Sequence, residues 1–415
     1  MKLYHGDCLE ELRKLDDNSV DAVITDPPYG LSNTKPAQVA DVLKAWVTGD
    51  TEAVPTKRGG FMGKDWDSFV PPPAVWEECM RVLKPGGHMA VFAGARTQDL
   101  MGLSIRLAGF DIRDTLGWIY GSGFPKSHNI SKAIDKAAGA EREVVGTATG
   151  ARNGNGENVD YGAFGSADDG TYAVTAPATS DAQRWDGWGT ALKPAIEPII
   201  LARKPLDGTV ANNVLAHGVG GLNIDACRVG SGTGEPKPEY VANGKNQVFG
   251  AGMGGGAWVN TSGRFPANVL LDEHAAKEMD EQSGVSKSNV RESEDKDDPG
   301  ATFSLGRTGV TARGHADSGG ASRFFPVFKY QAKAPKKERP VIEREDGTKI
   351  QHPTVKPVAL MEWLIALITP PNGTVLDPFA GSGTTLQAAR NKGFTPIGIE
   401  QDADYIQLIN KRLGH

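Results

Sequence analysis

The stretch SVDAVITDPPYG, residues 19–30, runs from an apolar segment directly into an acidic turn that contains two prolines. Its first half is typical of a buried strand. The turn begins at Asp26, and Pro27 and Pro28 fix their own φ angles and restrict the residue before each of them. Tyr29 then presents an aromatic ring. A carboxylate held rigidly where a core strand ends predicts a ligand or catalytic site in an α/β sheet.

A second stretch, TVLDPFAGSGTT at residues 374–385, also runs from a strand into a turn. The predicted strand ends at Asp377, and a helix is predicted to begin at Thr384. Gly381 and Gly383 lie in the turn between them, where glycines let the backbone come close to a ligand. The stretch therefore predicts a ligand site beyond the carboxyl end of a parallel strand.

The acidic residue that ends the next predicted strand, Glu400, narrows the class of ligand. It follows Asp377 at about the interval, roughly 20 residues, at which an acidic side chain commonly binds a ribose. The turn lacks both the third glycine of the dinucleotide pattern and the lysine of a phosphate loop. A nucleoside without a polyphosphate, such as S-adenosyl-L-methionine (SAM), is therefore favoured over NAD or ATP.

Together, DPPYG at 26–30 and DPFAGSGTT at 377–385 resemble the motifs of the SAM-dependent DNA amino-methyltransferases. The catalytic motif precedes the cofactor glycines, with a long insertion between them, which is similar to the circularly permuted β group of that family. The resemblance covers roughly residues 1–130 and 345–415. It implies an α/β, Rossmann-like methyltransferase fold with a mostly parallel sheet, circularly permuted, with a large loop-rich insertion.

The resemblance also implies further cofactor residues. HGDCLEEL at 5–12 is similar to the segment that opens the β group, and HPTVKP at 352–357 resembles the motif that closes over the methionine moiety. On this basis the residues predicted to bind SAM are Asp7, Cys8, Thr354, Lys356, Asp377, Phe379, Gly381, Gly383, Thr384 and Glu400. WGTALKPAIEPIILARKP at 188–205 is similar to segments of phage and bacterial members, but it suggests no chemical role.

The acidic turn suits methylation of an exocyclic amine, and its predicted catalytic residues are Asp26, Pro27, Pro28 and Tyr29. The Asp26 carboxylate and the Pro27 carbonyl would accept the two amine hydrogens, and Tyr29 would stack on a flipped base. Such a step requires no metal. The predicted activity is N6-adenine methylation of double-stranded DNA at a specific sequence. N4-cytosine methylation is the alternative, although those enzymes more often begin the tetrapeptide with Ser. A non-catalytic DNA-binding subunit of a restriction-modification complex and a different nucleotide-binding α/β domain are further alternatives.

The chain divides by composition into residues 1–140, the catalytic half, 141–340, a Gly-rich insertion, and 341–415, the SAM-binding half. The two outer parts alternate predicted strands and helices, which favours a parallel sheet. The insertion is the predicted target-recognition region, and within it 191–205 and 264–273 are predicted to be structured. A basic and aromatic segment near its end supplies the predicted DNA-binding residues, Arg323, Lys329, Lys333, Lys336 and Lys337. An edge strand with a solvated basic loop is the alternative reading of that segment.

The bulk composition favours a soluble cytoplasmic protein. Of the 415 residues, 39% are hydrophobic and 23% are charged, and no apolar run reaches the length of a membrane span. The net charge of −6 argues against indiscriminate coating of nucleic acid. Candidate partners are double-stranded DNA, a second copy of the chain and a cognate restriction endonuclease. Trp118, Tyr120 and Phe124 are alternative candidates for a wall against the flipped base.

Overall fold

The computed structural model describes residues 1–32, 34–55, 67–121, 123, 127–149, 171–230, 263–288, 291–294, 310–313, 317–328, 340–344 and 346–414. These residues form two compact units. The first unit comprises Met1–Ser122 and Ile196–His415, and the second comprises Gly123–Ala195.

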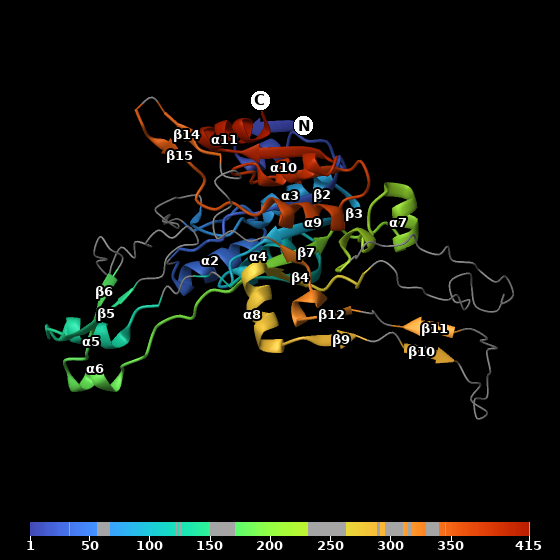
Figure 1. Ribbon diagram of the computed structural model, residues 1–415. Coiled ribbons are helices and arrows are strands. Elements are labelled where there is room, and N and C mark those ends of the chain that lie inside the picture. The colour runs from blue at the N-terminus through green and yellow to red at the C-terminus, as the bar shows by residue number, and fades with distance from the viewer. Residues whose placement is uncertain are drawn as a thin grey trace. The chain divides into compact units, whose positions relative to one another are not determined.

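The first unit is built on a sheet in which the described residues form nine strands (Figure 1). Their spatial order is β1 (Lys2–His5), β17 (Thr395–Glu400), β16 (Thr374–Asp377), β2 (Val20–Thr25), β3 (Leu83–Phe92), β7 (Ile196–Arg203), β4 (Asp111–Ile119), β8 (Val269–Asp272) and β13 (Val327–Phe328). Among these described pairs, only those of β7 with β3 and β4 are antiparallel. The predicted mostly parallel sheet is thus confirmed. We call the edge at which the parallel strands end the carboxyl edge, and it is there that β7 begins.

Helices cover both faces of this sheet. One face packs against α1 (Cys8–Leu12), α2 (Pro36–Val47), α3 (Pro73–Val82) and α4 (Gln98–Leu107). The other packs against α9 (Val358–Ile368) and α10 (Thr384–Asn391). Val23 of β2 contributes to the first core and Ile24 to the second. Burial of both faces explains why the predicted core strands are continuous apolar runs.

The sequence of α3 shows how such a helix is specified. Pro73 stands in its first turn, where a missing N–H removes no helical hydrogen bond. Trp76, Cys79 and Val82 recur at spacings of three and are fully buried against the sheet. Remaining described elements of the first unit are α7 (Val210–His217), η3 (Asp225–Cys227), α8 (Glu273–Ser283), β9 (Ser286–Ser288), β10 (Arg291–Glu294), β11 (Val310–Arg313), β12 (Asp317–Gly319), η4 (Ala321–Phe324), β14 (Ile342–Glu343), β15 (Lys349–Ile350) and α11 (Ala403–Leu413). None of the helices in the described part of the chain has the length and apolarity needed to span a membrane.

Three strands of the sheet, β7, β8 and β13, come from the predicted insertion at 141–340. The first two of these strands lie in the segments predicted to be structured. Because their apolar residues complete the sheet, these strands belong to the first compact unit, and the two units divide at 122/123 and 195/196. The residues that join β4 to β7 make up the second unit.

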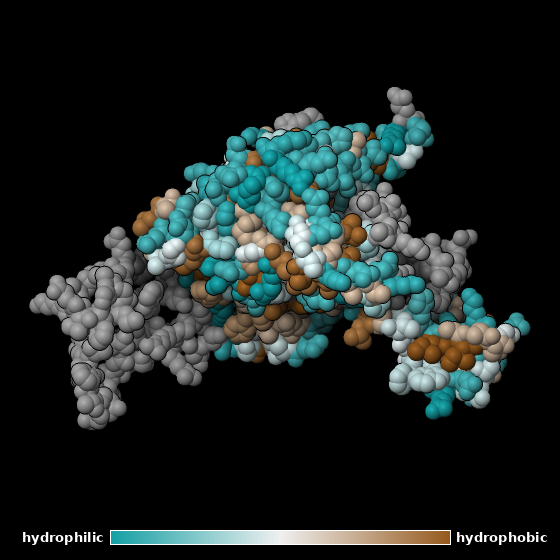
Figure 2. Space-filling model, turned by 180° about the vertical axis from the view of Figure 1, so that it is seen from behind, coloured by the Kyte–Doolittle hydropathy of each residue, from teal (hydrophilic) through white to brown (hydrophobic). Residues whose placement is uncertain are grey.

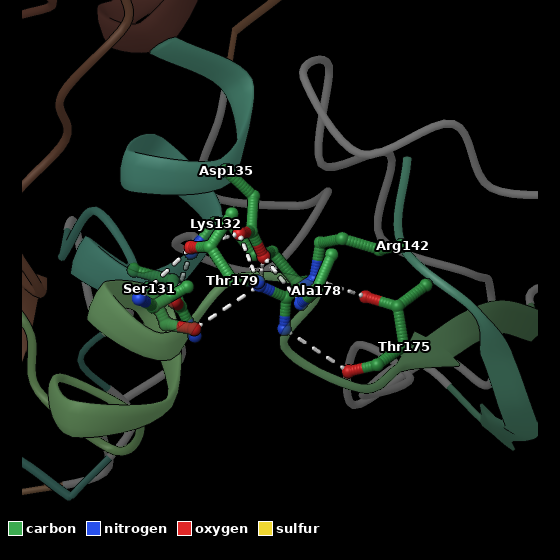
Figure 3. A network of polar contacts seen from close by, with 9 residues as sticks. Ser131, Lys132, Asp135, Arg142, Thr175, Ala178 and Thr179 are labelled. Carbon is green, nitrogen blue, oxygen red and sulfur yellow. Dashed lines mark hydrogen bonds and ion pairs between the residues drawn. The ribbon is translucent and has the colours of Figure 1, made fainter. Parts of the chain in front are cut away.

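The second unit contains α5 (Ile130–Ala137), β5 (Val144–Thr149), β6 (Thr171–Thr175) and α6 (Ser180–Arg184). Its described interior is largely polar, and Figure 2 shows apolar side chains, in brown, at its surface. The centre is Asp135, which is 1% exposed. Its carboxylate accepts hydrogen bonds from the amides of Ala178 and Thr179, both at 3.0 Å, and from Arg142 (Figure 3). Burial alone would raise the pKa of Asp135, but these donors outweigh it and lower the pKa.

Candidate active site

Four of the predicted acidic residues lie side by side along the carboxyl edge. Asp7, Glu400, Asp377 and Asp26 end or follow β1, β17, β16 and β2, which are successive strands of the sheet. Parallel neighbours lie about 4.8 Å apart, so the four residues lie at neighbouring strand ends, where α/β sheets commonly bind ligands in a crevice. The hydroxyl of Thr25 donates to Asp377 Oδ1 at 2.7 Å and joins the two predicted halves of the site.

The turn at 26–30 is held by groups from elsewhere in the chain. Asp67 Oδ1 accepts from the backbone N–H of Tyr29 at 2.8 Å and of Gly30 at 3.0 Å. The Thr97 hydroxyl donates to the Tyr29 carbonyl at 2.6 Å. Gly30 has a φ of +67°, and a Cβ there would lie 2.7 Å from the backbone N of Val70. Only glycine fits this turn without displacing its neighbours.

A charged cluster surrounds Asp26. Tyr29 Oη donates to Asp26 Oδ1 at 2.7 Å, and Lys356 Nζ lies 2.9 Å from Asp26 Oδ2. The same ammonium donates to Tyr29 Oη at 3.0 Å and lies 3.1 Å from Glu197 Oε2. It also lies 4.8 Å from the ring centroid of Phe92 at the end of β3. The turn and the HPTVKP segment, which are far apart in sequence, therefore meet at one carboxylate.

The protonation states in this cluster follow from burial and charge. Lys356 is 8% exposed, which would by itself lower its pKa, but the Asp26 and Glu197 carboxylates outweigh burial and raise the pKa. Burial and the Asp26 charge raise the pKa of Tyr29. Lys356 is therefore a cation, and the Tyr29 phenol keeps its proton as a donor.

The two predicted SAM-binding acids at the ends of β17 and β16, Glu400 and Asp377, are buried. Glu400 Oε2 accepts from the Gly381 amide and Oε1 from the Asp402 amide, both at 2.8 Å. Burial raises the pKa of Glu400 to about 7 despite these two donors. Burial likewise raises the pKa of Asp377 to about 6, although the hydroxyls of Thr385 and Thr25 lower it. A cationic ligand beside these two carboxylates would stabilise their ionised forms and would itself be attracted to them.

The glycine turn is covered by the HPTVKP segment. Gly381 and Gly383 have φ angles of +53° and +78°, and a Cβ on Gly381 would lie 3.0 Å from His352 Nε2. Thr384 is buried at the start of α10, whereas Thr354 is exposed. Lys356 contacts the charged cluster around Asp26 that is described above.

The remaining predicted cofactor residues lie at the ends of β1 and β16. Asp7 caps α1, because its Oδ1 accepts from the Leu9 amide at 2.9 Å. Burial raises the pKa of the neighbouring Cys8 thiol to about 12, so it stays protonated. The Phe379 ring lies 6.4 Å from that of Trp76.

Arg323 is the only predicted DNA-binding residue within the described ranges. Its Nη1 donates to the carbonyls of Gly319 at 2.6 Å and Gly320 at 2.7 Å, and its guanidinium lies 4.3 Å from the Phe324 ring centroid. It precedes β13, at the end of the strands opposite the carboxyl edge. The predictions at Lys329, Lys333, Lys336 and Lys337 lie outside the described residues.

The aromatic residues predicted to pack against the flipped base, at and after the end of β4, differ in how deeply they are buried. Trp118 is 2% exposed and belongs to the core. Tyr120 is half-buried, and its ring centroid lies 5.9 Å from that of Trp118. Phe124 lies outside the described residues.

Comparison with known proteins shows which family the chain belongs to. The model of the N6/N4 family, described as DNA methylase, matches residues 20–411. The chain belongs to this family of DNA methylases. The methylase is 23% identical to the Type II methyltransferase M.HindIII of Haemophilus influenzae over 433 residues, which are 99% of this chain and 94% of that enzyme. It is 46% identical to M.HinfI, also of Haemophilus influenzae, over 77 residues, 19% of this chain and 21% of that one. Among solved structures, the PvuII DNA methyltransferase, described as cytosine-N4-specific, is 14% identical with a TM-score of 0.44, covering 99% of this chain and 85% of that chain.

Two residues of the methylase escaped the sequence prediction: Asp67, which accepts hydrogen bonds from the turn at 26–30, and Glu197, which pairs with Lys356. Glu197 lies in the segment at 188–205, which was singled out without a chemical role. Asp67 follows no predicted strand and belongs to no recognised motif. The alternation of polar and apolar residues identifies which side chains are buried, but it carries no signal for a contact between distant loops.

Proposed function

We propose that this methylase transfers a methyl group from SAM to the exocyclic N6 of adenine within a specific sequence of double-stranded DNA. The observation that carries the proposal is the position of the Asp26 carboxylate. It lies at the carboxyl edge, one strand from Asp377, and it is oriented by Tyr29 and Lys356. A base amine bound at Asp26 would therefore be adjacent to a ligand bound at Asp377 and Glu400.

The crevice suits SAM by the chemistry of its side chains. Glu400 would accept hydrogen bonds from the ribose, and Asp377 would face the charged amino-acid end. The Gly381 turn lets the backbone approach the ligand. Bound SAM supplies an activated methyl group on a positively charged sulfur. A polyphosphate would be repelled by the same two carboxylates.

Asp26 would act on the base amine before and during transfer. That amine is a weak nucleophile because its lone pair is delocalised into the ring. The Asp26 carboxylate would accept one amine hydrogen and the Pro27 carbonyl the other, which favours a tetrahedral nitrogen with a localised lone pair. Pro27 and Pro28 limit the movement of both acceptors. Because a duplex buries the target atom, the base must be flipped out, and Tyr29 would stack against it.

The choice of adenine over cytosine rests on Asp26 itself. The first residue of the tetrapeptide is Asp, whereas N4-cytosine enzymes of the resembled family more often carry Ser. A non-catalytic DNA-binding subunit would have no need of the buried charges that orient Asp26. Relatives named Type II methyltransferases favour a modification enzyme of a restriction-modification system.

A single experiment tests this proposal. The protein is expressed in a host that lacks DNA methylation, and modified bases are mapped by single-molecule sequencing, with Asp26→Ala as the inactive control. We expect N6-methyladenine at one short recurring sequence in the wild type and none in the variant. N4-methylcytosine would instead support the alternative base. Unmodified DNA beside folded, DNA-binding protein would support the non-catalytic subunit.

A further inference from the structure

Glu197 reaches the catalytic cluster because its strand runs against its neighbours. It is the second residue of β7, which pairs antiparallel with both β3 and β4. The amino end of β7 therefore lies at the carboxyl edge, beside the ends of the parallel strands. From there Glu197 Oε2 lies 3.1 Å from Lys356 Nζ.

The resulting cluster carries an uneven charge. Its two carboxylates, Asp26 and Glu197, contribute −2 and the Lys356 ammonium contributes +1, which leaves −1. Lys356 is 8% exposed, so water screens these charges weakly. Without Glu197 the cluster would be neutral, and without Lys356 it would hold two acids and no counter-ion. The other titratable groups that face it are Tyr29, Tyr120, His352 and Asp377.

This charge matches what methyl transfer does at the base. The N–C bond forms as the S–C bond breaks, so one positive charge moves from the donor sulfur to the exocyclic nitrogen, which then loses one proton to water. We propose that Glu197 is a positioning residue for this step. Through Lys356 it holds the Asp26 carboxylate in place, and it leaves the pocket one negative charge in excess where positive charge develops. The inference rests on the proposed function and assigns a role to a residue outside both recognised motifs.

Single substitutions should disturb this balance in opposite directions. Glu197→Gln makes the cluster neutral and leaves Lys356 paired with Asp26 alone. Because Lys356 then competes with the base amine for the Asp26 carboxylate, kcat should fall about 10- to 100-fold. Lys356→Gln leaves two unpaired acids. One of them should then take up a proton near neutral pH. The fall of kcat on the acidic side of its pH profile, the acid limb, should therefore move to higher pH.

The double variant Glu197→Gln/Lys356→Gln decides the question. It restores a charge of −1 on Asp26 alone, so kcat should exceed that of the poorer single variant at least tenfold, and the acid limb should return toward the wild-type position. If the two residues only fill space, their losses should multiply and the acid limb should stay unchanged in all variants. That result would overturn the inference.

The measurement is single-turnover methylation of DNA from a methylation-free host, with isotope-labelled SAM, from pH 5.5 to 9. Lys84→Gln is the matched control, because Lys84 Nζ pairs with Asp21 Oδ1 at 2.7 Å at the opposite end of β2 and β3. Its acid limb should match the wild type. Glu197→Asp keeps the charge but shortens the side chain, so it should lower kcat with an unchanged acid limb. That variant tests the same contact if Glu197→Gln does not fold. Absence of methylation by the wild type would refute the proposed function, and the inference with it.

Discussion

The Thr25 hydroxyl donates a 2.7 Å hydrogen bond to Asp377, so the last residue of one central strand is tied to the last residue of its neighbour. Thr25 is fully buried and directly precedes Asp26. The bond therefore connects the turn that would bind the target amine to the crevice that would bind the methyl donor. Any shift of β2 against β16 would change the distance between the two reactants, and such a shift is costly when positioning limits the rate.

Thr25→Val should weaken cofactor binding by removing one donor from Asp377. Valine has nearly the same shape but accepts and donates nothing, so the pKa of Asp377 should rise above its value of about 6. Loss of a hydrogen bond to a charged group costs about 1.5–3 kcal/mol. Calorimetric titration with SAM between pH 5 and 8 should show weaker binding whose midpoint lies at higher pH. Thr25→Ser keeps the hydroxyl and should behave as wild type; identical curves for the Val and Ser variants would contradict the role.

Glu400→Gln should remove a pH dependence of stability. The pKa of Glu400 is about 7 in the folded protein against an ordinary 4.5. Between those values the folded state binds more protons than the unfolded state, so the free energy of unfolding falls as pH rises from 4.5 to 7. This loss amounts to about 3 kcal/mol. Urea unfolding of both proteins without SAM, from pH 4.5 to 8, should show that the free energy of unfolding falls more steeply with pH in the wild type than in the variant. Parallel curves would mean that Glu400 ionises normally.

Gly30→Ala should destabilise the protein by more than the positive φ of residue 30 alone would cost. A left-handed alanine costs roughly 1–2 kcal/mol, and Gly393→Ala, at a φ of +79° with no atom within 4 Å of the added Cβ, should show that cost alone. At Gly30 the Cβ also meets the backbone of Phe69 and Val70 at 2.7–2.9 Å. Chemical denaturation should therefore show a clearly larger loss for Gly30→Ala, with loss of methyl transfer. Equal losses at the two positions would argue against the close packing of this turn.

Asp67→Ala should lower kcat while SAM affinity stays unchanged. The substitution leaves the backbone N–H groups of Tyr29 and Gly30 without their acceptor, and an unpaired buried group costs about 1–3 kcal/mol. The turn would then relax away from the geometry that suits the amine. Asp67→Asn retains an acceptor oxygen and should retain most activity. Steady-state kinetics would give kcat, and a separate titration would give the affinity for SAM. A fall in SAM affinity with little change in kcat would contradict this role of Asp67.

The sequence predicted those parts of the fold that depend on local pattern. The continuous apolar runs of β2, β16 and β17 identify core strands because both faces of a parallel sheet are buried. The acidic residues Asp26, Asp377 and Glu400 follow from these strands, since parallel strands end at a common edge. Neither inference requires knowledge of distant contacts.

The direction of β7 could not be predicted in the same way. An apolar run indicates burial, but it does not state which neighbour a strand pairs with or in which sense. Because β7 runs antiparallel to its neighbours, Glu197 near its start lies at the carboxyl edge. The contact of Asp67 with the turn at 26–30 likewise depends on tertiary packing between segments far apart in the sequence. The sequence therefore identified the two motifs but missed the side chains that hold them.

Arg142→Met should destabilise the second unit locally and leave the stability of the first unit unchanged. The Arg142 guanidinium donates to Asp135 Oδ2, to the Ser131 hydroxyl at 3.0 Å and to the Thr175 carbonyl at 3.2 Å. Since the described interior of this unit is largely polar, few apolar contacts would compensate for a buried Asp135 carboxylate that has lost its counter-ion. Hydrogen exchange should quicken at residues 127–149 and 171–195 and stay slow in the central sheet. Arg184→Met, at an exposed position in α6, should change neither region. Slow exchange throughout the Arg142 variant would show that the polar network does not hold this unit together.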